Sequence, residues 1–172
     1  MNTAFQIRPL QPDDVGAFFA LLQAKAAFDG CPESLLATEA SLRAALFGPG
    51  PVTRALVAVV DGRLIGMATF YAIFSTFIMQ PGLWLDDLYL DPAHRGKGIG
   101  RAMMAQLASI ASAAGCERLD WIVATANRDG KRFYERIGAN ISDQVQLCRL
   151  TGPAIRRLAD NQGGSRTRYN PA

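Results

Sequence analysis

The stretch LWLDDLYLDPAHRGKGIGRAMMAQL, residues 83–107, decides the fold because it joins a strand to a helix through a glycine-rich loop. Residues 83–90 are rich in apolar side chains, which is typical of a strand. Asp91 and Pro92 end that strand, because proline cannot donate to a strand ladder. Over residues 99–114 apolar side chains recur at helical spacing, and Gly115 suits the left-handed closure of a helix. The sequence therefore predicts strand, loop and helix in direct succession.

The loop His94-Arg95-Gly96-Lys97-Gly98-Ile99-Gly100 has the features of an anion-binding cradle. Glycines let backbone amides approach a phosphate, and the N-terminus of a helix adds positive potential. Arg95 and Lys97 would strengthen that potential. A Walker phosphate loop and a dinucleotide fingerprint both need glycine spacings that this loop lacks. On these residues alone, an ordinary glycine-rich connection stays open as an alternative.

The rest of the chain alternates strand and helix patterns without internal repeats, so the sequence predicts a mixed α/β fold. Before residue 83 we expect a strand at 5–10, helices over 15–22 and after Thr38, and a hairpin of strands 55–60 and 64–77. After the helix that follows the loop we expect a strand at 119–123, a helix at 129–137 and a last strand at 144–150.

Length and composition point to one globular domain. The 172 residues are 49% hydrophobic and 19% charged, a balance typical of a protein that folds around its own core. We expect a single domain over residues 1–160 and a flexible tail over residues 161–172. The net charge of +3 is too small to predict a nucleic-acid partner, which usually requires clustered cations on one face.

Metal and membrane chemistry have little support in the sequence. Cys31, Cys116 and Cys148 lack the spacing of a metal knuckle or a disulfide scaffold, and the single histidine, His94, cannot form a metal cluster. We expect no metal and three reduced thiols. No apolar run approaches the roughly 20 residues that span a bilayer, and no signal sequence opens the chain. We therefore expect no membrane partner and a cytoplasmic location.

The segment Arg95-Gly96-Lys97-Gly98-Ile99-Gly100 resembles the acetyl-CoA loop of the GNAT superfamily of N-acetyltransferases, written Gln/Arg-x-x-Gly-x-Gly/Ala. The resemblance extends to Leu85-Asp86-Asp87-Leu88-Tyr89-Leu90 before the loop, and to Asn127 and Phe133-Tyr134-Glu135-Arg136-Ile137-Gly138-Ala139 after it. These motifs look most like the diamine (spermidine/spermine) and thialysine acetyltransferase branch. The resemblance implies the GNAT fold, a mixed, strongly twisted β-sheet flanked by helices, in which acetyl-CoA docks where neighbouring strands splay apart.

By this resemblance the loop and the strand before it would hold acetyl-CoA. The amides of Gly96, Gly98 and Gly100 would bind the pyrophosphate, while the backbone of Leu88 and Leu90 would lie alongside the pantetheine. Asn127 would help to fix the cofactor arm, although an asparagine there also suits a helix N-cap. The implied cofactor-binding residues are Leu88, Tyr89, Leu90, Arg95, Gly96, Lys97, Gly98, Ile99, Gly100, Arg101, Asn127 and Tyr134.

The resemblance also implies the catalytic groups. Tyr134 matches a tyrosine that protonates the departing CoA thiolate, and a phenol stays protonated at neutral pH; without the motif it would be an aromatic packed on a helix. Asp86 stands where relatives carry glutamate and would accept the proton of the amine. Its shorter side chain favours a relay through water.

Three carboxylates are expected on the acceptor side, namely those of Asp86, Asp87 and Asp29. Asp86 and Asp87 are adjacent on a strand, so we expect their side chains to face opposite sides of the sheet. A structural hydrogen bond is the alternative role for either one. For Asp29 the alternative is a solvated position in the loop between two helices.

Together these residues predict direct transfer of acetyl from acetyl-CoA to a primary amine, expected to be a small cationic amine similar to a polyamine or thialysine. No cysteine lies in the motifs, so a covalent acetyl-enzyme is not indicated. The alternatives are acetylation of a protein lysine or N-terminus, a non-catalytic acetyl-CoA-binding regulatory module, and an interaction domain that uses the basic tail. The branch that the chain resembles also implies a homodimer.

Overall fold

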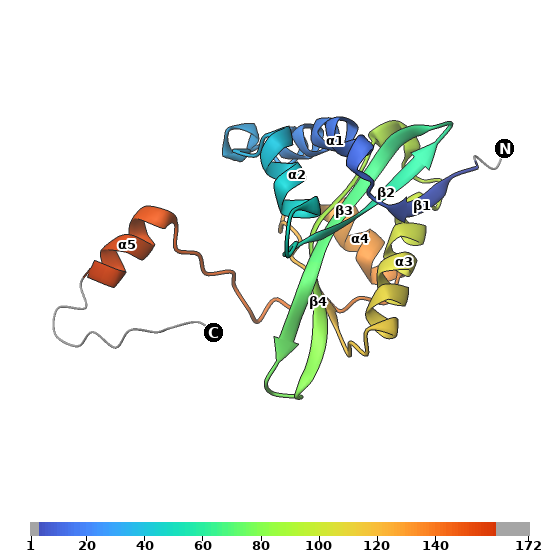
Figure 1. Cartoon of the computed structure of the whole chain (residues 1–172). Helices are drawn as coiled ribbons and strands as arrows, with labels where there is room; N and C mark the ends of the chain where they lie inside the picture. The colour runs from blue at the N-terminus through green and yellow to red at the C-terminus, as the bar shows by residue number, and fades with distance from the viewer. Residues whose placement is uncertain (1–3, 161–172) are drawn as a thin grey trace. The chain divides into compact units, whose positions relative to one another are not determined.

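The computed structural model describes residues 4–160, which form two compact units that meet in the sequence at Asn127 and Arg128 (Figure 1). The first unit contains five strands and the helices α1 (Val15–Phe28), α2 (Glu39–Phe47) and α3 (Ile99–Ala113). The second contains the helices α4 (Arg128–Arg136) and α5 (Gly152–Asp160). The expected tail at 161–172 lies outside the described residues.

The five strands form one mixed sheet in the order β1-β2-β3-β4-β5. Neighbours are antiparallel up to β4, whereas β4 and β5 run parallel. The mixed α/β fold expected from the sequence is confirmed. The strands are β1 (Gln6–Pro9), β2 (Arg54–Val60), β3 (Arg63–Ser75), β4 (Gln80–Leu90) and β5 (Leu119–Asp120), with short 3-10 turns at Pro12–Asp14, Pro32–Ser34 and Pro92–His94.

Local chemistry sets the element boundaries. Asp61 and Gly62 both have positive φ, which is the backbone that a tight β-hairpin requires between β2 and β3. Thr38 caps α2 reciprocally: the Ser41 amide donates to Thr38 Oγ1 at 3.1 Å, and the Thr38 amide donates to Ser41 Oγ at 2.8 Å. These two boundaries lie where the sequence predicts them.

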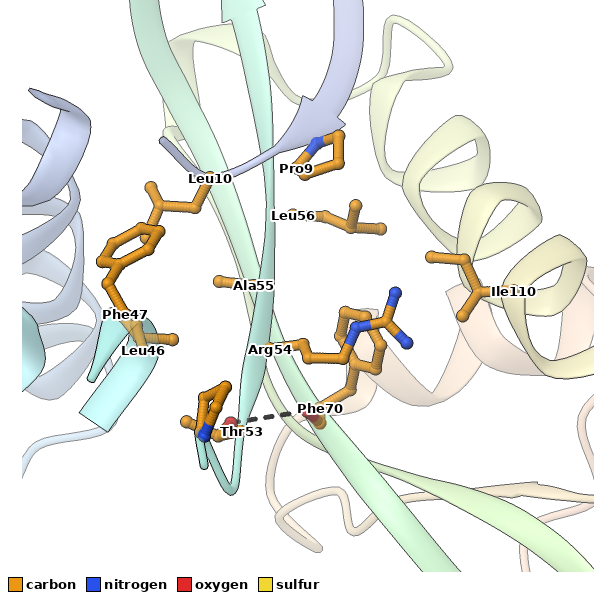
Figure 2. Close-up of a pocket in the computed structure, with 11 residues that line it drawn as sticks. Pro9, Leu10, Leu46, Phe47, Thr53, Arg54, Ala55, Leu56, Phe70 and Ile110 are labelled. Atoms are coloured by element: carbon orange, nitrogen blue, oxygen red, sulfur yellow. Dashed lines mark hydrogen bonds between the residues drawn. The ribbon is translucent and has the colours of Figure 1, made fainter. Parts of the chain in front are cut away.

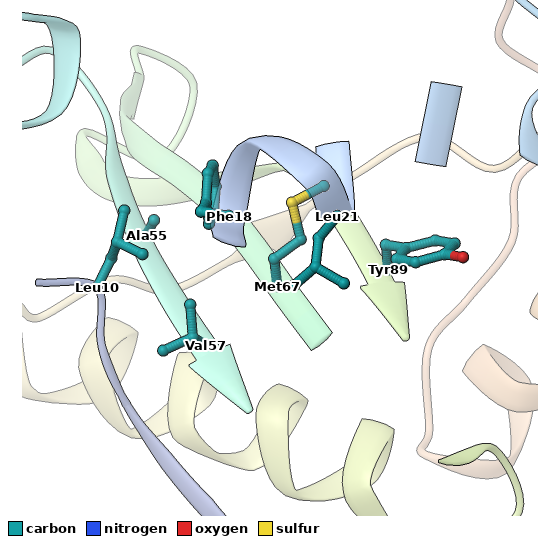
Figure 3. Close-up of a cluster of buried hydrophobic side chains, with 7 residues drawn as sticks. All are labelled: Leu10, Phe18, Leu21, Ala55, Val57, Met67 and Tyr89. Atoms are coloured by element: carbon teal, nitrogen blue, oxygen red, sulfur yellow. The ribbon is translucent and has the colours of Figure 1, made fainter. Parts of the chain in front are cut away.

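The sheet separates α1 and α2 from α3 (Figures 1 and 2). On the α1 side, Phe18 and Leu21 pack against side chains of β2, β3 and β4 (Figure 3). On the other side, the buried face of α3 contributes Met103 and Leu107, both fully buried. The central strands are therefore held between helices that pack on both faces of the sheet. The cluster in Figure 3 consists of Leu10, Phe18, Leu21, Ala55, Val57, Met67 and Tyr89.

Two expectations for the C-terminal third are wrong. The strand expected at 119–123 is only Leu119–Asp120, because β5 pairs with β4 at just two positions. The segment expected as a strand at 144–150 forms none in the described chain; Val145 and Leu147 are 74% and 59% exposed, so its alternating pattern buries no face. Helix α5 was not expected, although Gly152-Pro153 places a proline at a helix start, where proline is favoured.

Candidate active site

The parallel pair β4 and β5 separates almost as soon as it forms. Leu83 pairs with Leu119 and Trp84 with Asp120, and no described residue continues the ladder along that edge of β4. From residue 85 to residue 90, β4 therefore has a strand neighbour only on its β3 side. Backbone N–H and C=O groups need hydrogen-bond partners, so an edge left open inside a sheet is suited to an extended, amide-containing ligand.

The open edge of β4 leads directly into the glycine loop. Asp91 accepts a hydrogen bond from the Ala93 amide at 2.8 Å and turns the chain. Gly96 and Gly98 have φ of +74° and +81°, and Gly98 is the N-cap of α3. A Cβ at either glycine would meet no heavy atom within 4 Å, so the space beside both residues is open. Left-handed glycines at a helix N-terminus direct backbone amides toward that space, which fits an anion.

Arg95 braces this loop against α1. Its guanidinium lies 4.7 Å from the centre of the Phe28 ring and 5.8 Å from that of Tyr89, and its Nε donates to the carbonyl of Leu90 at 3.0 Å. Phe28 and Tyr89 also meet edge to face at 6.2 Å. Contacts of this kind, a cation over aromatic faces, hold the start of the loop in place.

The other loop residues expected to bind the cofactor differ in how exposed their side chains are. Lys97 and Arg101 are exposed, so their charges are available near the cradle, whereas Ile99 is fully buried and can offer a ligand only its backbone. His94 Nδ1 is buried without a hydrogen-bond partner among the described residues and lies 3.8 Å from a carboxylate oxygen of Asp91.

Lys25 of α1 joins two of the expected acceptor-side carboxylates. Its Nζ lies 2.5 Å from Asp29 Oδ2 and 3.0 Å from Asp87 Oδ1, while Thr69 Oγ1 donates to the other oxygen of Asp87 at 2.9 Å. Burial alone would lower the pKa of Lys25, but the hydrogen bond to Asp29 and the charge of Asp87 outweigh it and raise that pKa. Asp29 and Asp87 are therefore brought together around a firmly charged ammonium group.

Asp86 occupies a β-bulge. Phe70 pairs with Leu85 and Thr69 with Asp87, so the ladder between β3 and β4 skips Asp86. The pKa of Tyr71 is raised, first by burial and then by the negative charge of Asp86. Because Tyr71 and Thr69 are two residues apart on β3, they share a face, and this favours the same side of the sheet for Asp86 and Asp87. The bulge therefore interrupts the strict alternation on which the expectation for this pair rests.

Tyr134 and Asn127 fall on either side of the boundary between the two units. The Asn127 amide donates to the Ala124 carbonyl at 2.9 Å, and α4 begins at the next residue, as an N-cap position requires. Tyr134 is half-buried near the end of α4, with its ring 5.2 Å from that of Phe133. Gly138, with φ of +94°, follows the helix as expected.

Residues 20–139 match the Acetyltransferase (GNAT) family. The chain belongs to this family. It is an N-acetyltransferase of the GNAT type, and the glycine loop, the open edge of β4 and α4 all lie within the matched region or at its boundary.

Several relatives of this GNAT enzyme are acetyltransferases named for amine substrates. Thialysine N-epsilon-acetyltransferase of Sus scrofa is 27% identical over 164 residues, which cover 89% of this chain and 96% of that protein. L-ornithine N5-acetyltransferase of Arabidopsis thaliana is 31% identical over 98 residues, covering 57% of this chain and only 43% of the plant protein. Among solved structures, an integron cassette protein of V. cholerae superposes with a TM-score of 0.73 at 27% identity, covering 92% of this chain and 98% of that one.

Sequence reasoning missed Lys25 and Phe28, the two residues of α1 that contact β4 and the glycine loop. Lys25 and Asp29 stand four residues apart at the end of a helical pattern, a spacing that predicts an ion pair. Their contact with Asp87 could not be read from the sequence, because it depends on how α1 packs on the sheet. The same holds for Phe28, which reaches Arg95 only in the folded chain.

Over residues 4–160, no three His, Cys, Asp or Glu side chains gather as a metal ion would require. No helix in that range is both long enough and apolar enough to cross a membrane.

The cradle makes a prediction about Gly98. An alanine there must adopt a positive φ, which destabilises a residue by about 1–2 kcal/mol, and its methyl group would enter the open space beside the loop, where we expect the pyrophosphate. Gly62→Ala is the matched control, since Gly62 has a similar φ of +75° and equally open surroundings in the β2–β3 turn. We expect both variants to lose similar stability, while calorimetry shows weaker CoA binding for Gly98→Ala only. Equal CoA affinities for the two would contradict the cradle.

Proposed function

We propose that this enzyme transfers acetyl directly from acetyl-CoA to the primary amine of a small cationic molecule. The observation that carries the proposal is the continuity of the open edge of β4 with the left-handed glycines of the loop. An extended arm can pair along the first, and a pyrophosphate can bind the second. The relatives named for thialysine, ornithine and tyramine support a small amine acceptor.

The chain's own residues fit acetyl-CoA. The loop would hold the pyrophosphate through the amides of residues 96–100, with Lys97 and Arg101 adding positive charge. Backbone groups of Leu88 and Leu90 would pair with the pantetheine amides, with buried Tyr89 between them fixing the strand. Arg95 would act mainly by holding the loop, because its guanidinium already stacks on Phe28.

The acceptor side is acidic. Asp29, Asp87 and Lys25 form a cluster with a net charge of −1, to which exposed Asp86 adds another negative charge. A protonated amine would be drawn to this region. Asp86, on the bulge, would accept the amine proton through a water molecule, and Asp87 and Asp29 would act through their hold on Lys25.

The transfer needs two proton movements. The amine must lose a proton before its nitrogen bonds to the acetyl carbon, and Asp86 would take that proton. As the carbon–sulfur bond breaks, the hydroxyl of Tyr134 would give its proton to the sulfur, with Asn127 helping to fix the cofactor arm. We also propose that the enzyme works in the cytoplasm as a homodimer.

An amine screen tests the proposed reaction. With acetyl-CoA and purified enzyme, thiol release should give a kcat/KM for spermidine, thialysine or ornithine at least about tenfold above that for peptides with a free N-terminal alanine or an internal lysine. Preference for the peptides would favour the protein-acetylating alternative. Binding of acetyl-CoA without thiol release for any amine would favour the regulatory module.

Replacing Asp86 and replacing Asp87 are predicted to have different effects. Asp86→Asn should lower kcat/KM for cationic amines about 10²-fold with little change in CoA affinity, because it removes the proton acceptor and keeps the side chain's size. Asp87→Asn weakens the contact with Lys25, so its main effect should be a loss of about 1 kcal/mol of unfolding free energy. The reverse ranking in turnover, at equal folded fraction, would make Asp87 the acceptor-side carboxylate.

Tyr134→Phe removes only the phenolic hydroxyl. Because general acid catalysis is worth about 10²–10⁴ in rate, kcat should fall by that factor while the melting temperature and the acetyl-CoA dissociation constant stay near the parental values. Single-turnover thiol release measures the rate, and calorimetry measures the affinity. A parental rate, or a loss of CoA binding in step with stability, would exclude Tyr134 as the general acid.

A further inference from the structure

The acceptor side of the site already contains an ammonium group of the chain itself. Lys25 Nζ lies 2.5 Å from Asp29 Oδ2 and 3.0 Å from Asp87 Oδ1. Thr69 Oγ1 donates to Asp87 Oδ2, so both oxygens of that carboxylate are engaged. A primary ammonium between two carboxylates makes the same charge-assisted hydrogen bonds that a cationic acceptor would make. Lys25 would therefore compete with an acceptor ammonium for these two carboxylates.

The core of the first unit holds Lys25 in this place. Leu21, one turn earlier in α1, packs with Met67 and Tyr89 in the buried cluster of Figure 3. Residues four apart lie on the same helix face, so Lys25 faces the same strands. Only 19% of its side chain is exposed. Burial lowers the pKa of Lys25, but the hydrogen bond to Asp29 and the charge of Asp87 raise it overall, so the ammonium group is charged at neutral pH.

The charges around Lys25 limit how many ammonium groups an acceptor can bring. Asp29 and Asp87 carry two negative charges and Lys25 carries one positive charge, so the three together are −1. Exposed Asp86, on the neighbouring bulge, brings the total to −2. Two ammonium groups would neutralise these four side chains. A third or fourth would meet no remaining net negative charge among them and would be repelled by Lys25.

We propose that Lys25 determines the acceptor class, by making the enzyme select small diamines over polyamines with three or four ammonium groups. If Lys25 were uncharged, the three carboxylates would carry −3 and would favour the more highly charged amines. Lys25 is then a specificity-determining residue and not a catalytic one, because its ammonium group is bound to carboxylates and takes no part in the transfer. This inference rests on the proposed function, which assigns those carboxylates to the acceptor side.

Competition between 1,4-diaminobutane and spermine for acetyl-CoA tests the proposal in the full chain, because the ratio of products reports the ratio of kcat/KM values. The parent should use diaminobutane at least as efficiently as spermine. Lys25→Met removes the charge and keeps the length of the side chain. It should raise the spermine-to-diaminobutane ratio about fivefold or more, since one unit charge at about 4 Å is worth about fivefold even in water. The change should lie mainly in KM, because charge attraction acts equally on bound substrate and transition state.

Three further variants separate charge from structure. Asp29→Asn removes one negative charge from the more exposed end of the cluster, so it should lower the ratio by a similar factor. The double variant Lys25→Met with Asp29→Asn returns the site to −2 and should return the ratio to the parental value. Arg43→Met is the matched control, because it changes the net charge of the chain equally from an exposed position on α2 and should leave the ratio unchanged.

Melting temperatures and CoA affinities distinguish a change in selection from damage to the fold. If Lys25 only stabilised the fold, Lys25→Met would lower the melting temperature and both rates together, with the ratio unchanged. A parent that prefers spermine, or a parental ratio in folded Lys25→Met that still releases thiol, would overturn this inference alone. If Lys25→Met is unfolded, a parental ratio in Asp29→Asn would overturn it instead. No thiol release from the parent with any amine would overturn the proposed function, and this inference with it.

Discussion

The loss of pairing between β4 and β5 after Trp84 is the constraint on which the site depends. A strand inside a sheet normally satisfies its backbone on both edges, and here one edge of β4 is left without a neighbour over the residues that lead to the loop. A strand with one open edge must be held in place by its other edge and by its buried side chains. Its long antiparallel ladder with β3, and the burial of Leu85 and Tyr89, supply that hold.

The last turn of α1 ties the two ends of this edge together. Lys25 contacts Asp87 beside the bulge, and Phe28, one turn later, supports Arg95 at the start of the glycine loop. Both contacts come from one helix face, since residues three apart are neighbours on a helix. Asp87 and the glycine loop are thus both contacted by a single helix whose own place is fixed by Phe18 and Leu21 in the core.

Features encoded locally could be predicted from the sequence. The cap at Thr38, the hairpin turn at Asp61-Gly62 and the loop glycines each follow from short-range chemistry, and the structure has them where expected. Features that depend on pairing across the fold could not. The bulge at Asp86 is a difference in register between two strands, and the alternating pattern at 144–150 predicts a strand only where a partner is present. Lys25 was missed for the same reason: its partner Asp87 lies on β4, far away in the sequence.

Negative charges lie within β4, and positive charges follow in the loop and helix after it. Asp86 and Asp87 stand about 13 Å and about 10 Å from Leu90, counting four and three residues at the rise of a strand, and the loop beyond Leu90 presents Lys97, Arg101 and a helix N-terminus. Both separations exceed the Debye length of about 8 Å at physiological ionic strength, so the two ends neutralise each other only weakly. An anionic group and a cationic group can therefore bind at opposite ends of one open edge, with the reacting atoms between them. Lys25 offsets the charges of Asp29 and Asp87, which would otherwise repel each other and destabilise the fold.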